Sequence, residues 1–134
     1  MQKYVLILLS IFSCLVQAEE VDCENAMTTQ ELNVCASREM LAADSTLDEY
    51  LSKAKDKSAH ETGSVELLKK SQIAWHAYRK AYCDAIYQMW SGGTIRGVMF
   101  SGCMIQLTKQ RTHQIWEDYL TYMDSSPPVL PEPK

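Results

Sequence analysis

The sequence predicts an all-α fold, a small antiparallel bundle of three to four helices cross-linked by two disulfide bonds. Three long segments carry apolar residues at helical spacing. The chain has only 5 Gly and 4 Pro, few for a sandwich or barrel with many tight turns. With 134 residues, of which 46% are hydrophobic, it has the length and composition of one globular domain.

The first 18 residues have the features of a secretory signal peptide. Lys3 gives a positive start, residues 4–15 are mainly apolar, and small side chains precede the expected cleavage after Ala18. Because the apolar run is shorter than the ~20 residues of a membrane helix, no stable membrane span is predicted. We therefore expect a periplasmic or secreted protein. Lipid attachment at Cys14, in a weak lipoprotein-type sequence, is a minor alternative.

Cleavage at this position would leave four cysteines, and an even number in a small exported chain indicates two disulfides. The four are Cys23, Cys35, Cys83 and Cys103. Three pairings are possible, and the pairing of sequence neighbours would close loops of 12 and 20 residues. No Cys-x-x-Cys spacing supports a zinc site, so neither a metal nor a cofactor is predicted.

The predicted helical domain covers residues 19–123, and its first helix begins at a capping box. Thr28 can accept a hydrogen bond from the backbone of Glu31, whose carboxylate can reach back to the helix start. Apolar residues then recur at helical spacing as far as Ala54, with charged residues between them. The polar stretch 57–63 is expected to end this helix.

Two further helices are predicted on either side of a Gly-Gly turn. The second covers about residues 64–90, and the third covers about 95–123. Gly97 and Gly102 are expected to make the first turns of the third helix irregular. Residues 124–134 contain all four prolines and are predicted to form an extended, mobile tail.

The charge balance and the motifs argue for binding rather than catalysis. The 17 acidic and 13 basic residues give a net charge of −4, and no basic face for nucleic acid is evident. A negative net charge favours binding to a basic partner, or it only increases the solubility of the protein. The sequence contains no nucleophile elbow, no phosphate-binding glycine loop and no His-Glu-x-x-His motif. We predict that the protein is not an enzyme.

One side of the predicted second helix concentrates unusual residues at spacings of three and four. These are Gln72, Trp75, Arg79 and Cys83. An arginine on such a side is half-buried and needs a carboxylate, for which Glu39 is the best candidate. The favoured interpretation is a structural ion pair between two helices. The alternative is a recognition surface with Trp75, Tyr78 and Arg79 as anchors, because these residue types dominate interface hot spots.

At these motifs the chain resembles the small bacterial envelope domain named for the N-terminal domain of the LprI lysozyme inhibitor. The resemblance covers about residues 22–120. It is carried by Asp22-Cys23-Glu24-Asn25-Ala26-Met27-Thr28-Thr29-Gln30-Glu31-Leu32-Asn33-Val34-Cys35-Ala36, by Glu39, Ala43, Leu47 and Tyr50, by Gln72 to Cys83 with its Ala-Trp-x-x-Tyr-Arg core, by Gly92-Gly93-Thr94 and Cys103, and by Leu107-Thr108-x-x-Arg111. The sequence departs from the family pattern at Asp48, Ile73 and Lys80, where Asn, Arg and an acidic residue are frequent.

The resemblance implies a helical, disulfide-bonded, exported domain, and lysozyme inhibition is the leading activity that it suggests. Lysozymes are commonly cationic, so an acidic domain would associate with them by charge steering. The residues expected to make the contact are the acidic lead Glu19, Glu20, Asp22 and Glu24 and the helical acids Asp44, Asp48 and Glu49. The alternative is a non-inhibitory envelope module that binds another envelope protein through the side of Trp75 and Arg79, with the tail as a spacer.

Overall fold

The computed structural model describes residues 20–134, in which three α-helices and one π-helical turn form and no strand occurs. They are α1 (Thr29–Lys57), α2 (Ser64–Met89), α3 (Arg96–Ile115) and the π-helical turn η1 (Trp116–Leu120). The predicted signal peptide, with Cys14, lies outside the described residues. None of the helices in this part of the chain combines the length and apolar character needed to cross a membrane.

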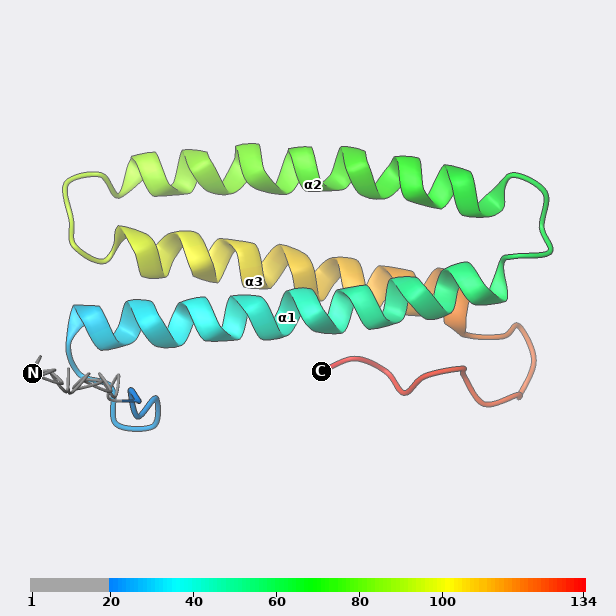
Figure 1. Ribbon diagram of the computed structural model, residues 1–134, viewed down its shortest axis with the longest axis horizontal. Coiled ribbons are helices and arrows are strands. Elements are labelled where there is room, and N and C mark those ends of the chain that lie inside the picture. The colour runs from blue at the N-terminus through cyan, green and yellow to red at the C-terminus, as the bar shows by residue number, and fades with distance from the viewer. Residues whose placement is uncertain (1–19) are drawn as a thin grey trace, which may run out of the picture.

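The helices lie side by side with their long axes nearly aligned (Figure 1). Consecutive helices are antiparallel, so α1 and α3 run in the same direction. α3 packs against both α1 and α2, which makes it the central helix of the bundle. This arrangement confirms the predicted all-α bundle.

The helix boundaries follow local signals in the sequence. The Glu31 backbone N–H donates to Thr28 Oγ1 at 3.2 Å, and the Thr28 N–H donates to the Glu31 carboxylate at 2.8 Å, which completes the predicted capping box. The backbone hydrogen bonds from Thr28 and then Met27 lower the pKa of Glu31. Gly63, which precedes α2, has φ +80°, a left-handed conformation that glycine adopts without strain.

The core lies near the α1–α2 connection, where apolar residues of every helix meet. Its buried members are Leu47, Tyr50, Leu51, Ala54, Leu68, Ile115 and Leu120. The two disulfides lie toward the other end of the bundle and join Cys23 to Cys35 and Cys83 to Cys103. Sequence neighbours are therefore paired, so one bridge ties the lead to α1 and the other ties α2 to α3.

The third helix differs from its prediction at both ends. We expected irregular first turns and a helix that continues to Met123, but α3 is regular through Gly97 and Gly102 and is followed by the π-helical turn η1. Gly97 is required by close packing instead, because a Cβ at this position would overlap the side chain of Asn33 on α1.

The proline-containing tail has no helix, as its prolines require, and it lies along the bundle rather than pointing away from it (Figure 1). The Tyr50 hydroxyl donates to the Pro131 carbonyl at 2.7 Å, and the Trp116 indole N–H donates to the Leu130 carbonyl at 2.9 Å. These contacts place the tail against α1 and the end of α3. Its mobility remains a prediction.

The two glycines at the start of α3 provide a matched test of helix packing. Gly97→Ala should destabilise the protein, because the Asn33 side chain that it would meet is held by a 2.7 Å hydrogen bond to the Thr29 carbonyl. Gly102→Ala meets nothing within 4 Å and should stabilise the helix by about 0.5–1 kcal/mol. Thermal melting of both variants measures the difference. Equal melting temperatures would contradict the close approach of α1 and α3.

Candidate functional site

Arg79 occupies the centre of the bundle and is 7% exposed. Its Nη1 donates to Asp44 Oδ1 on α1 and, at 2.6 Å, to Thr108 Oγ1 on α3. Thr108 is fully buried, and its hydroxyl lies 2.8 Å from the Met104 carbonyl, to which it donates. A single guanidinium nitrogen therefore joins all three helices.

The face of Trp75 covers the same guanidinium, with the ring centroid 4.8 Å from the Arg79 Cζ. Trp75 is partly buried and packs against the core, so the ring and the charge stabilise each other within the bundle. Arg79 Nε is buried and has no hydrogen-bond partner among the described residues. The structure thus places two of the three predicted anchors inside the bundle rather than on an open surface.

Glu39 is not the partner of Arg79, which corrects the sequence prediction. Five residues separate Glu39 from Asp44, a rotation of about 140° around the helix, so their side chains point in different directions. Glu39 instead pairs with Lys109 of α3 at 3.3 Å, and both side chains are exposed. The predicted structural ion pair exists, but Asp44 supplies its carboxylate.

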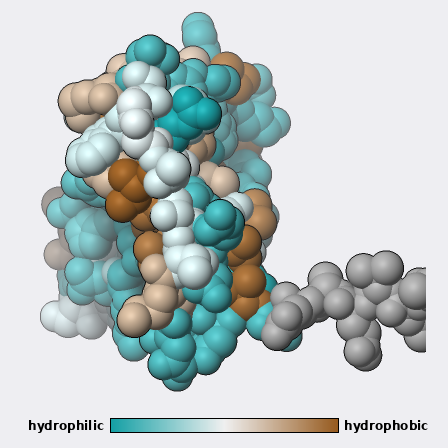
Figure 2. Space-filling view, turned by 90° about the vertical axis from the view of Figure 1, so that its left-hand side faces the viewer, coloured by the Kyte–Doolittle hydropathy of each residue, from teal (hydrophilic) through white to brown (hydrophobic). Residues whose placement is uncertain are grey.

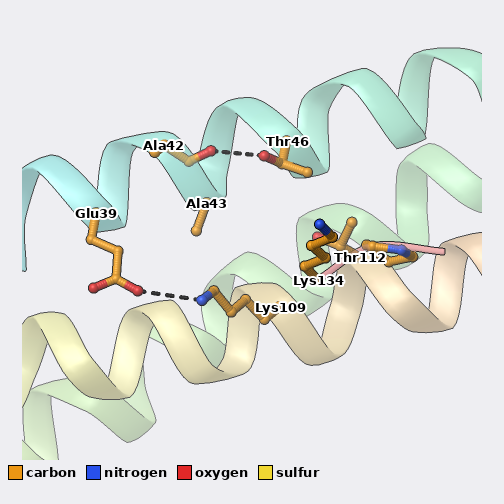
Figure 3. A pocket seen from close by; sticks show the side chains of 8 residues that line it. Glu39, Ala42, Ala43, Thr46, Lys109, Thr112 and Lys134 are labelled. Atoms are coloured by element: carbon orange, nitrogen blue, oxygen red, sulfur yellow. Dashed lines mark hydrogen bonds and ion pairs between the residues drawn. The ribbon is translucent and has the colours of Figure 1, made fainter. Parts of the chain in front are cut away.

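The Glu39–Lys109 pair borders a small pocket between α1 and α3 (Figure 3). The other lining residues are Ala42, Ala43, Thr46, Thr112, Pro133 and Lys134. The small side chains of α1 leave the pocket open, and the end of the tail enters it from the side opposite Glu39. The pocket is thus a groove between two helices that the chain's own C-terminal residues partly fill.

The three acids of α1 that were predicted to contact a partner fall into two groups. Asp44 is half-buried and already bound to Arg79, so its carboxylate is not free for a partner. Asp48 and Glu49 are exposed, so a basic partner can reach them directly.

The acidic lead is exposed beside the first disulfide. Asp22 accepts hydrogen bonds from the Asn25 side chain at 2.7 Å and from the Glu24 backbone at 3.0 Å. These bonds, with that from Asn25 as the largest cause, lower the pKa of Asp22 and favour its charged form. Glu19 lies outside the described residues.

Tyr78 is the one predicted anchor that lies on the surface within the described chain. It is 54% exposed and stacks on Tyr82, which is 50% exposed, with ring centroids 5.9 Å apart. At the end of the bundle that carries the α2–α3 turn, hydrophobic side chains form small separate groups in a largely hydrophilic surface (Figure 2). An extended apolar patch is not visible on that face.

Two polar contacts between helices were not predicted from the sequence. Asp44 stands three and seven residues before the buried Leu47 and Leu51, a spacing that would have placed it toward the core. The second contact is a pair of hydrogen bonds that Arg111 of α3 donates to Gln72 at 3.2 Å and to Ser71 at 3.0 Å of α2. Burial lowers the pKa of Arg111. Thr108 carried no comparable signal, since a threonine on a helix is usually exposed.

No group of three or more metal-binding side chains occurs within residues 20–134.

Removing the half-buried carboxylate of Asp44 should destabilise the bundle. Asp44→Ala leaves the Arg79 charge without its counter-ion, so we expect the free energy of unfolding to fall by about 3 kcal/mol. The matched control Glu39→Ala breaks only the exposed pair with Lys109 and should cost less than about 1 kcal/mol. Urea unfolding of both variants decides between the two pairings. A larger loss for Glu39→Ala would contradict the observed cluster.

Comparisons with known proteins cover the three α-helices. A profile of the family described as "Lysozyme inhibitor LprI" matches residues 22–115. An uncharacterised protein of Rhizobium meliloti (strain 1021) is 34% identical over 112 residues, which cover 75% of this chain and 81% of the relative. No solved structure gives a significant match. The matched residues extend from the first cysteine motif to the end of α3, and the chain belongs to the LprI lysozyme inhibitor family.

Proposed function

We propose that this protein is an exported inhibitor that binds a cationic lysozyme through acidic residues on α1. The observation that carries the proposal is membership of the LprI family over residues 22–115. Inhibition needs only a stable complex that covers the enzyme's cleft. A rigid domain with exposed charge can form such a complex without any catalytic group of its own.

Charge supports this choice of partner. The chain has a net charge of −4, and lysozymes are commonly cationic, so their association would be accelerated by long-range attraction. Asp48 and Glu49 are exposed neighbours on α1, while Asp44 is occupied by Arg79. We therefore assign the contact to Asp48 and Glu49, with the acidic lead as a further charged segment.

The predicted export also agrees with such a role. The predicted signal peptide would deliver the mature chain to the periplasm or outside the cell, where a lysozyme acts on the cell wall. Two disulfides suit an oxidising compartment and stabilise a small domain there.

A non-inhibitory envelope module is the second candidate. The stacked and exposed pair Tyr78 and Tyr82 favours it, because exposed tyrosines are enriched in protein interfaces. A different envelope protein would bind there, on a part of α2 that the acidic residues of α1 do not occupy.

The test is the muramidase activity of a c-type lysozyme titrated with the purified mature protein. We expect stoichiometric inhibition that weakens as salt rises to about 0.15 M, where charges are screened beyond about 8 Å. Neutralising the two exposed acids with Asp48→Asn and Glu49→Gln should weaken inhibition about tenfold, at roughly 0.5–1 kcal/mol for each charge.

The matched control changes the net charge equally at another place. Glu117→Gln with Asp118→Asn neutralises two exposed acids of η1 and should leave inhibition nearly unchanged. An equal loss in both double variants would assign the effect to net charge rather than to α1. No inhibition at a micromolar excess of protein would refute the proposed activity and direct attention to the tyrosine pair.

A further inference from the structure

The tail is bound through its main chain. Leu130 and Pro131 present consecutive carbonyls, which accept hydrogen bonds from the Trp116 indole at 2.9 Å and from the Tyr50 hydroxyl at 2.7 Å. Neither bond depends on the identity of the tail side chains. The backbone N–H of Val129 donates to the Leu120 carbonyl at 2.8 Å and closes the turn that precedes this segment.

Both donors are held firmly by the bundle. Tyr50 is 6% exposed and belongs to the core, and Trp116 packs against the same core. Burial, with a smaller contribution from Glu49, raises the pKa of Tyr50, so its hydroxyl remains a donor at neutral and mildly alkaline pH. These two rigid aromatic side chains exist as donors before anything binds them, which lowers the cost of binding.

The bound segment contains a proline motif. Pro128-Val129-Leu130-Pro131 is a Pro-x-x-Pro motif within the stretch 127–134. The chain bends at Val129 and Leu130, and the carbonyls of Leu130 and Pro131 then face their donors in the bundle. Proline fixes φ and so reduces the conformational freedom that such a segment loses on binding.

The tail contributes little to the core. Leu130 packs against the core cluster, whereas Val129, Pro131 and Glu132 are exposed. Glu132 lies 3.0 Å from His113 in an exposed contact. One apolar side chain and a few polar contacts can detach without breaking the helix packing.

We propose that the surface formed by Tyr50, His113 and Trp116 is a binding site for proline-containing peptides, and that the tail occupies it as a tethered ligand. Beyond these contacts the tail continues to the pocket between α1 and α3, which Pro133 and Lys134 help to line (Figure 3). A partner would present a Pro-x-x-Pro segment with an apolar residue before the second proline. Tyr50 directly follows Asp48 and Glu49 on α1, so this site adjoins the acids assigned to lysozyme.

Tethering determines how the site responds to such a partner. A short linker gives the tail an effective concentration of the order of millimolar, so a free peptide competes poorly with it. A substitution that detaches the tail should therefore allow a separate peptide to bind at the vacated site.

The test uses the full mature chain with Leu130→Asp and a fluorescent peptide of residues 127–134. The charge cannot enter the apolar contact of Leu130, so the tail should detach and the peptide should bind at least about tenfold more tightly than to the wild type. The matched control Val129→Asp changes an exposed neighbour and should keep the wild-type affinity. Fluorescence anisotropy measures both.

A substitution in the binding site, rather than in the tail, tests the recognition itself. Adding Tyr50→Phe to Leu130→Asp removes one donor without changing the packing, and it should weaken peptide binding about fivefold. A peptide with alanine in place of its prolines should bind more weakly as well. Equal binding of the two peptides, or no gain in folded Leu130→Asp protein over the wild type, would overturn the proposal.

Hydrogen exchange in the wild-type chain covers the case in which Leu130→Asp does not fold. Excess peptide should accelerate exchange of the Val129 amide by displacing the tail and leave exchange of the α3 amides unchanged. An unchanged Val129 rate at millimolar peptide would also overturn the proposal.

Discussion

The buried guanidinium of Arg79 is the interaction on which the arrangement of the helices depends. A buried charge costs several kcal/mol unless polar partners compensate it. Here the compensation comes from Asp44 on α1 and Thr108 on α3 at the same time, with Trp75 over the face of the group. Because Arg79 must reach both acceptors at once, the rotation and the axial position of each helix are fixed. Apolar packing alone would fix them less specifically.

The remaining contacts divide the bundle into two interfaces. α1 and α3 approach closely because Gly97 leaves room for Asn33. α2 is joined to α3 by the Cys83–Cys103 bridge and by the contact of Gln72 with Arg111. The tail then lies along α1 and α3, on the side away from α2 (Figure 1).

The two proposals use adjoining parts of α1. The family match ends at residue 115, so Trp116 and the tail lie beyond the matched residues, whereas Tyr50 and the acids of α1 lie within them. A lysozyme bound at Asp48 and Glu49 and a peptide bound at Tyr50 and Trp116 would contact neighbouring residues of α1. The rigid bundle presents both.

Local sequence signals determined the elements: the capping box at Thr28 began α1, and glycine-containing turns separated the helices. The four cysteines that would remain after the predicted signal cleavage indicated two disulfides. The partners of polar side chains were decided by tertiary structure. Glu39 was the counter-ion predicted for Arg79, whereas the rotation of α1 against α2 selects Asp44. Gly97 is a helix breaker by propensity but a packing requirement beside Asn33, and the prolines that exclude a helix do not reveal that Tyr50 binds the tail. Propensities and caps act between near neighbours in the chain, whereas burial and hydrogen-bond pairing depend on residues that only the folded bundle brings together.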